Sequence, residues 1–315
     1  MLVKKNLLIR LFLAIFSFFI LAALAIRNPY LISDGDNYVM HATMDIDFSS
    51  PIFFTSSLYW LIVKSVSFDP VLFPGFISFL IAILISLISL KLKPVDFFLF
   101  LFLLIVNPMF FTTFELALRN GLALSLFLFL IVYRKDNFSP IVCLVHPGML
   151  PVVVIFLILK NLKISLRNIV FILFGLSLLT FLFYNFFDVL LAAREYSEAD
   201  DNNSAKFITY LSFLVLSIVY YKSFGENKLK LYMPLFYLLW LILGFTTPFA
   251  ARVFVQAVPV FVIIVFLYAD NAIFKRLFLA LMFVFSIIMS IKSHDFITYN
   301  NGWVDTWLAL WNRYF

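Results

Sequence analysis

Cysteine and charged residues are scarce in this chain. Cys143 is the only cysteine among 315 residues, which excludes an intramolecular disulfide and a cysteine-based zinc site. Charged residues make up 13% of the chain and hydrophobic residues 64%, and the mean hydropathy is +1.06. No segment has the composition of a soluble domain. These scarcities indicate a protein whose main surroundings are membrane lipids.

Several functional motifs are also missing. The sequence has no Walker A loop, no H-E-x-x-H motif and no G-x-S-x-G motif. The net charge is +6, but Lys and Arg stand at the ends of apolar runs instead of on one polar face, which argues against nucleic acid as a partner. We predict no cofactor and assign no metal ligands.

Long continuous apolar runs predict an all-α polytopic integral membrane protein with about 9–11 transmembrane helices. The clear runs lie at about 6–26, 70–90, 95–111, 114–133, 166–187, 206–222, 230–250, 253–268 and 277–291. We find no internal repeat and no linker, so we expect a single transmembrane domain over residues 1–315. Its external loops are predicted at about 27–51, 188–206 and 292–315.

Two segments leave the topology open. Residues 51–68 are short for a span and contain Lys64, and residues 139–160 are interrupted at His146-Pro147-Gly148, which should break a helix. If both re-enter without crossing, there are nine spans, with about 15 Lys and Arg inside against about 6 outside. If both cross, there are eleven spans and the split is about 12 against 9. We prefer nine spans, which puts Arg119 on the same outer side as loop 27–51.

Ionisable residues within apolar runs are the first candidates for a functional site, because burying them in a membrane is costly. Glu115 and Arg119 are spaced i, i+4 and can pair on one helix face. They form either a structural ion pair or a guanidinium offered to a phosphate. His146 is either a core histidine or a general acid or base beside a broken helix. Arg252, with Gln256 one turn later, is either an interfacial arginine or a second phosphate or sugar contact.

The outer loops add acidic and aromatic candidates. The D-x-D spacing of Asp34 and Asp36 suits a divalent cation or a general base, or simply a solvated turn. The acidic loop around Tyr196 is either a lid over an external site or a connector.

The order of these motifs along the chain resembles that of the EpsG-like branch of the Wzy polysaccharide polymerases. That family has an Arg after its first helix, a G-x-D-x-x-Y loop, a short Pro-led helix, an R-Q-x-x-A helix and an H-x-S-A-L segment. The corresponding residues here are Arg27, Gly35-Asp36-Asn37-Tyr38, Pro51-Ile52-Phe53-Phe54, Arg119-Asn120-Gly121-Leu122-Ala123 and His146-Pro147-Gly148-Met149-Leu150, with Arg252 as a late membrane-border Arg. The chain departs from the pattern at Asn120, in a compressed Gly-to-Asp spacing, and in the Pro-Gly that follows His146.

The resemblance implies a GT-C-like, multi-pass glycosyltransferase of the bacterial cytoplasmic (inner) membrane. It would polymerise undecaprenyl-pyrophosphate-linked oligosaccharide repeat units on the outer face and use no nucleotide sugar. Its partners would be the lipid-linked oligosaccharide, membrane lipids, and a chain-length regulator and flippase of the same pathway. A flippase or transporter of the same oligosaccharide is the main alternative. A His146-dependent acyltransferase and a structural subunit are weaker ones.

For such a substrate, the chemistry of each candidate residue suggests a role. Arg119 and Arg252 would contact the pyrophosphate, and Arg27 would be a further anion contact. Asp36 or His146 would be the general base. The remaining substrate-binding candidates are Tyr38, Glu115, Gln256 and Tyr196, with Glu115 orienting Arg119.

Overall fold

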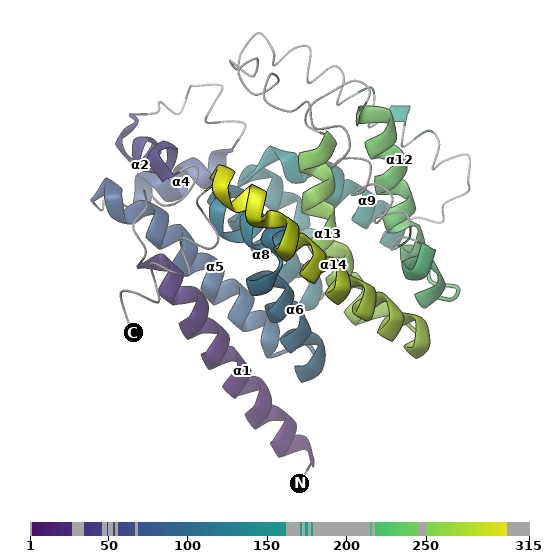
Figure 1. The fold of residues 1–315 in the computed structure, drawn as a ribbon. Helices are drawn as coiled ribbons and strands as arrows, with labels where there is room; N and C mark the ends of the chain where they lie inside the picture. The colour runs from purple at the N-terminus through teal and green to yellow at the C-terminus, as the bar shows by residue number, and fades with distance from the viewer. Residues whose placement is uncertain are drawn as a thin grey trace. The chain divides into compact units, whose positions relative to one another are not determined.

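The computed structural model describes residues 2–26, 35–45, 49, 53, 56–66, 69–161, 171, 174, 175, 178, 215, 218–244 and 250–300. Every regular element in these residues is a helix (Figure 1), which confirms the all-α prediction. The chain forms two compact units, Met1–Val153 with Phe283–Phe315, and Val154–Met282. The single domain stays a prediction.

The first unit contains the elements that surround Arg119. They are α1 (Leu2–Ala25), α2 (Gly35–Thr43), α4 (Ser57–Ser65), η2 (Pro70–Leu72), α5 (Phe73–Ser89), α6 (Pro94–Val106), α7 (Pro108–Phe111), the π-helical turn η3 (Thr112–Leu116), α8 (Leu118–Val132), and the 3-10 helices η4 (Asp136–Leu144) and η5 (Pro147–Met149). Two further helices, α9 (Leu150–Asn161) and α14 (Ala272–Asn300), each have residues in both units.

Helices α1 and α5 pack side by side in opposite directions (Figure 1). Near the start of α1, the Arg10 guanidinium donates to the carbonyl of Leu90 at 3.2 Å, just beyond α5. Farther along, the hydroxyl of Ser17 donates to that of Ser86 at 3.2 Å within the interface. At the other end, a Cβ on Gly75 would overlap the carbonyl oxygen of Ala25, so glycine allows the two backbones to approach.

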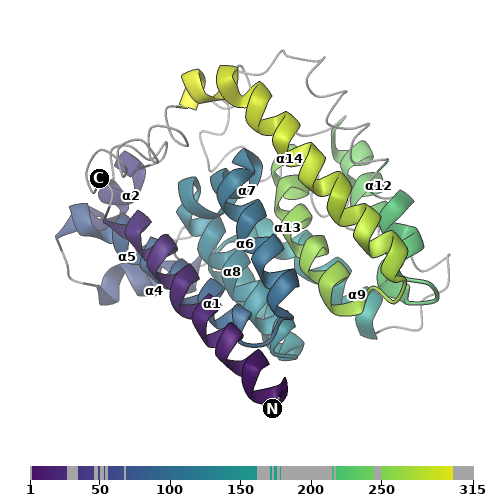
Figure 2. The same ribbon diagram turned by 60° about the horizontal axis from the view of Figure 1, so that its bottom comes forward.

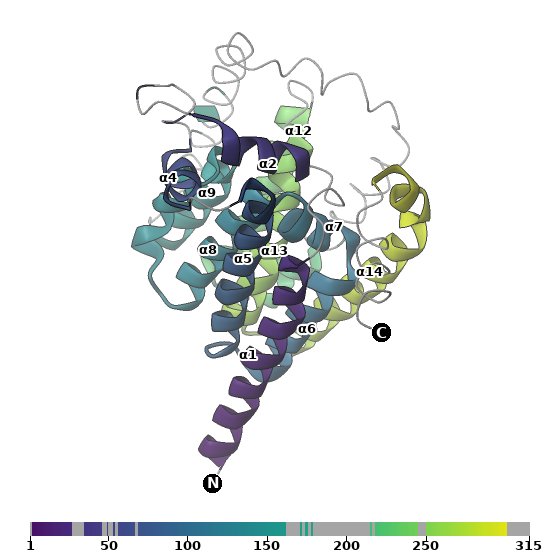
Figure 3. The same cartoon turned by 90° about the vertical axis from the view of Figure 1, so that its left-hand side faces the viewer.

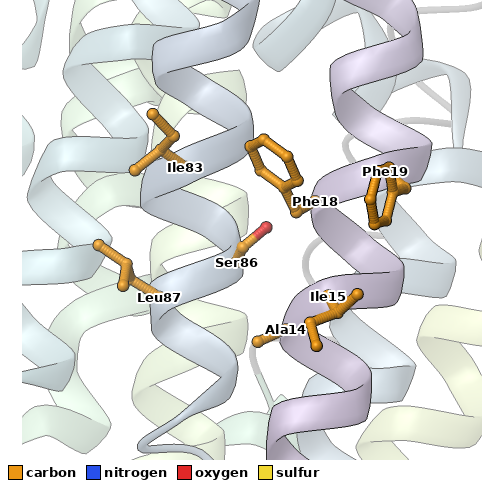
Figure 4. Close-up of a pocket in the computed structure, with 7 residues that line it drawn as sticks. All are labelled: Ala14, Ile15, Phe18, Phe19, Ile83, Ser86 and Leu87. Atoms are coloured by element: carbon orange, nitrogen blue, oxygen red, sulfur yellow. The ribbon is translucent and has the colours of Figure 1, made fainter.

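An apolar groove runs between these two helices (Figure 4). It is lined by Ala14, Ile15, Phe18, Phe19, Ile83, Ser86 and Leu87.

Helix α8 lies against α5 and runs in the same direction. The hydroxyl of Tyr133, just after α8, donates to the carbonyl of Leu87 near the end of α5 at 2.9 Å. Arg134 has a φ of 59°, and the amide of Lys135 donates to the carbonyl of Leu130 at 2.8 Å. This is a Schellman ending, which stops α8 and turns the chain into η4.

The two ends of this bundle therefore differ in charge. One end, which we call the basic end, carries Arg10, Lys91, Lys93, Arg134 and Lys135. Helices α2 and α4 lie at the opposite end, called here the α2 end, beside the first turns of α5 and α8 (Figure 3). Helix α6 begins just after Lys93 and packs along α1 and α5 (Figure 2).

The second unit contains η7 (Lys228–Leu231), α12 (Tyr232–Gly244) and α13 (Ala250–Tyr268). Helices α12 and α13 pack against each other. The ring of Tyr220 lies within 6 Å of the rings of Phe224, Phe261 and Phe278, and its hydroxyl donates to the carbonyl of Leu229 at 3.1 Å. This aromatic core fixes the start of α12.

Two segments of the described chain, Leu7–Ala25 and Pro70–Ser89, are long and apolar enough to span a bilayer. The predicted runs 95–111, 114–133, 230–250, 253–268 and 277–291 are also largely helical, whereas most of 166–187 and 206–222 lies outside the described residues. The interruption predicted at His146 is confirmed, because η4 ends at Leu144 and α9 begins only at Leu150.

Helical structure extends into two of the predicted external loops, whose side of the membrane stays a prediction. Helix α2 forms within the segment 27–51, and α14 continues through Asn300 instead of ending near 291. In both places we inferred a loop from polarity alone. A helix satisfies its own backbone hydrogen bonds and therefore tolerates polar side chains. The next Gly or Pro after α14 is Gly302, so no strong breaker interrupts it earlier.

The chain between α6 and α8 is not one continuous helix. The amide of Ala117 donates to the carbonyl of Thr112 at 2.9 Å, which closes a π-type turn, and Ala117 itself is non-helical (φ −92°, ψ 69°). Gly121, in the first turn of α8, faces this turn so closely that a Cβ would overlap the carbonyl oxygen of Phe114. The π-helical turn therefore depends on glycine at position 121.

We expect Gly121→Ala to destabilise the protein by about 1–3 kcal/mol, because the atom in its way belongs to the backbone. Gly175→Ala is the matched control, since a Cβ there meets nothing within 4 Å and alanine favours a helix. Thermal unfolding of both purified variants tests this. Equal midpoints in the two variants would contradict it.

Candidate functional site

Arg119 lies at the start of α8, where the helix has no side-chain cap of its own. The N-cap residue is Ala117, which cannot accept a hydrogen bond through its side chain. The backbone amide of Arg119 donates instead to the hydroxyl oxygen of Tyr38 at 3.1 Å. Tyr38 belongs to α2, so a residue 81 positions earlier caps this helix and ties α2 to it.

The side chain of Arg119 rests on an aromatic ring. Its guanidinium carbon lies 5.5 Å from the ring centroid of Tyr59, which is a cation–π distance. Arg119 is half-buried and Tyr59 is fully buried. Within the described part of the chain, no carboxylate forms an ion pair with Arg119. The guanidinium therefore keeps its positive charge available to an anion.

His41 completes the arrangement from α2. Its Nδ1 lies 3.0 Å from the hydroxyl oxygen of Tyr59, and its ring centroid lies 5.0 Å from that of Trp60. Trp60 is buried, with its centroid 5.2 Å from that of Tyr59. We call Tyr38, His41, Tyr59, Trp60 and Arg119 the Arg119 cluster. It joins α2, α4 and α8 at the α2 end.

Burial lowers the pKa of His41 from 6.5 to about 4, with a smaller contribution from the positive charge of Arg119. His41 is therefore neutral at pH 7, and one ring nitrogen can accept a hydrogen bond while the other donates. A neutral imidazole does not neutralise the positive charge of Arg119, which stays available to an anion.

His41, Tyr59 and Trp60 are not among the site residues predicted from the sequence. His41 lies at i+3 from Tyr38 and on the same face of α2, which could have marked it once α2 was recognised as a helix. Treating residues 27–51 as a loop hid that spacing. Tyr59 and Trp60 belong to a segment that we considered only as a possible span.

The predicted pairing of Glu115 with Arg119 is wrong. Glu115 lies in the π-helical turn and Arg119 in α8, and the non-helical Ala117 between them changes the register. The i, i+4 rule requires an uninterrupted α-helix. Glu115 is fully buried in the π-helical turn, on the other side of the break from Arg119.

Tyr38 and Asp36, both predicted from the first outer loop, are separated by the structure. Tyr38 is 6% exposed and belongs to the Arg119 cluster. Asp36 is exposed in the first turn of α2. Residues two positions apart on an α-helix lie on opposite faces, so Asp36 faces away from Tyr38. Asp36 has no hydrogen bond or ion pair with any residue of the described chain.

His146 is half-buried and extended (φ −146°, ψ 111°) at the junction of η4 and η5. Both of these 3-10 helices pack against α8, and η4 also contacts α4. His146 thus belongs to a segment that adjoins two helices of the Arg119 cluster. No hydrogen bond joins His146 to Arg119.

The remaining predicted residues belong to the second unit or are not described. Arg252 and Gln256 are one turn apart on α13, and Gln256 is 4% exposed. The side-chain oxygen of Gln256 has no hydrogen-bond partner within the described chain. Arg27 and Tyr196 lie outside the described residues. Among the residues that are described, no group of three or more His, Cys, Asp or Glu could hold a metal ion.

Comparison of the chain with protein-family models, curated proteins and solved structures finds no match.

We expect the shifted pKa of His41 to make stability depend on pH. Below pH 6.5 the unfolded chain binds a proton at this position, whereas folded His41 does so only near pH 4. Stability is therefore highest above pH 6.5 and falls as the pH drops toward 4. The thermal midpoint of the wild type should drop more between pH 7.5 and 4.5 than that of His41→Asn, which does not titrate. Parallel pH curves for the two proteins would refute this.

Proposed function

We propose that the protein is an integral membrane glycosyltransferase that polymerises oligosaccharide repeat units carried on undecaprenyl pyrophosphate. An acceptor sugar hydroxyl would attack the anomeric carbon of the growing glycan. The bond from that carbon to the pyrophosphate oxygen would break, and the lipid pyrophosphate would leave. Arg119 would stabilise the charge that develops on this leaving group.

The arrangement of Arg119 is the main observation behind this proposal. It is a half-buried cation at a helix N-terminus, where the helix dipole also favours an anion. It rests on an aromatic ring and pairs with no carboxylate of the described chain. An arginine can bind a phosphate through two parallel hydrogen bonds and does not lose its charge.

The family resemblance gains support from the contact between two of its motifs. Tyr38 ends the Gly35–Tyr38 segment and Arg119 begins the Arg119–Ala123 segment, and the two residues are hydrogen-bonded. Residues that a family pattern places far apart in sequence therefore meet at one site here. This is the expected result if both segments serve the same substrate.

The charges at the two ends of the bundle favour an outer-face site. The basic end would face the cytoplasm under the positive-inside rule, which leaves the α2 end and Arg119 outside. Helix α4 has 9 residues, about 14 Å, and is too short to cross a hydrocarbon core of about 30 Å. Both features agree with nine spans better than with eleven.

Contact with lipid would also account for the surface of α1. Leu8, Phe12 and Phe19 are 68%, 65% and 67% exposed. A helix that is apolar around its whole circumference belongs in a protein core or a membrane. The groove in Figure 4 has the same apolar character.

The general base is the second part of the proposal. Asp36 and His146 both stay candidates, and neither contacts Arg119 directly. Asp36 is exposed at the α2 end, where an acceptor sugar from outside would arrive. His146 lies on the segment packed against α8.

We expect Arg119→Ala and Arg119→Lys both to reduce polymer formation by about 10²-fold, because lysine cannot replace the two parallel hydrogen bonds. The assay is the length profile of surface polysaccharide in a strain lacking this gene and complemented with each variant, with protein level checked by immunoblot. Arg134→Lys, an exposed arginine at the basic end, is the control and should give the wild-type ladder.

The same experiment separates the competing functions. Single repeat units that still reach the surface indicate a polymerase. Loss of surface glycan with lipid-linked units trapped inside indicates a flippase. A full ladder from Arg119→Lys excludes the bidentate role, and an unchanged ladder after gene deletion refutes the proposed function.

We expect position 137 to face the cytoplasm and position 40 the outside. Both side chains are exposed, at the start of η4 and on α2. Asn137→Cys and Met40→Cys, each in a Cys143→Ser background, should react with a membrane-impermeant thiol reagent from opposite sides. Labelling of position 137 from outside would favour eleven spans.

A further inference from the structure

Tyr59, on α4, connects three other helices of the first unit through its hydroxyl and its ring. Its hydroxyl oxygen lies 3.0 Å from Nδ1 of His41 on α2. The guanidinium of Arg119 on α8 lies above its ring. Its ring also meets that of Phe73 at the start of α5, with centroids 6.2 Å apart. Tyr59 is 0% exposed, so none of these contacts competes with bulk water.

A buried phenol hydroxyl needs a hydrogen-bond partner, because leaving it unsatisfied costs free energy. Nδ1 of neutral His41 lies 3.0 Å from this hydroxyl and accepts its hydrogen bond in the tautomer that carries the proton on Nε2. This hydrogen bond holds the hydroxyl end of the Tyr59 ring in place. Trp60 holds the imidazole from the side at a centroid distance of 5.0 Å.

Arg119 depends on that ring for its position. An arginine side chain loses considerable rotamer freedom when it is held in one geometry. No carboxylate of the described chain pairs with it, and the hydrogen bond that Arg119 donates to Tyr38 involves only its backbone amide. The cation–π contact with Tyr59 is thus the interaction that orients the guanidinium.

We propose that His41 and Tyr59 are positioning residues, which hold the Arg119 guanidinium ready for a pyrophosphate through the hydrogen bond between them. Neither needs to touch the substrate. This inference rests on the proposed function for its biological meaning. Anion binding by Arg119 can be measured without any glycan.

Two substitutions at position 41 separate positioning from simple packing. Asparagine keeps a polar atom near the position of Nδ1, whereas leucine fills the space without a hydrogen-bond acceptor. Leucine favours a helix more than asparagine does, so a defect confined to His41→Leu cannot come from helix propensity. Tyr59→Phe is the matching change on α4, because it keeps the ring under Arg119 and removes only the hydroxyl.

The experiment measures the dissociation constant of inorganic pyrophosphate from the shift in thermal midpoint of the full-length purified protein. We expect His41→Asn to bind like the wild type, and His41→Leu and Tyr59→Phe each to bind about threefold to tenfold more weakly, the range for one lost hydrogen bond. The double variant His41→Leu with Tyr59→Phe should be no weaker than either single one. Met40→Ala, on the exposed face of α2, should bind like the wild type.

A second readout detects undocking of α2. Ala42→Cys in a Cys143→Ser background is half-buried and should react slowly with a thiol reagent. The proposal requires this rate to stay the same in His41→Leu. Faster labelling of His41→Leu, or equal losses of binding in His41→Asn and His41→Leu, would mean that His41 only supports the fold, and either result would overturn the proposal.

Two other results would also overturn it. One is wild-type pyrophosphate binding in His41→Leu, and the other is a lack of Arg119-dependent binding in the wild-type protein. Failure of the proposed function shows up separately, as an unchanged polysaccharide ladder after gene deletion. That result leaves the pyrophosphate measurement unaffected.

Discussion

The hydrogen bond from the Arg119 amide to the Tyr38 hydroxyl is the contact on which the rest of the site depends. Helix α8 follows a π-helical turn and begins after an alanine, so its first turn must find an acceptor elsewhere. Because that acceptor lies on α2, the helix start and the outer segment hold each other in place. The same docking puts His41, one turn after Tyr38, against Tyr59. A single polar contact across 81 residues thus determines which side chains surround the arginine.

The second constraint is the cost of placing a cation among aromatic side chains. Proteins usually neutralise a partly buried arginine with a carboxylate. Here the electron-rich face of Tyr59 replaces that carboxylate, and the neighbouring histidine is neutral at pH 7. The positive charge is therefore stabilised without being cancelled. That distinction matters for any function that requires the arginine to bind a phosphate and later release it.

A polymerase and a flippase for lipid-linked glycans would both need such an arginine, but they would use it differently. A flippase has to expose its site to both sides of the membrane, whereas a polymerase works from one. The Arg119 cluster lies at the end of the first unit opposite the basic residues, and Tyr133, Arg134 and Lys135 close the other end of α8 with a tight helix ending. A site at one end of the unit meets the requirement of a polymerase. The side-chain oxygen of buried Gln256, which has no hydrogen-bond partner within the described chain, marks a second polar position in the other unit.

The sequence by itself determined the apolar helices of the described chain, because long apolar runs leave the backbone no other way to satisfy its hydrogen bonds in lipid or in a packed core. It also determined the break before α9, since His146 precedes Pro147 and Gly148, and it marked Arg119 and Tyr38 as candidates. Only the tertiary structure decided that these two residues meet, because a contact over 81 positions has no local signal. It also separated Glu115 from Arg119, since the turn between them depends on how closely Gly121 approaches the carbonyl of Phe114. His41 became visible only when α2 docked, because its role comes from the two rings it touches and from no pattern of its own.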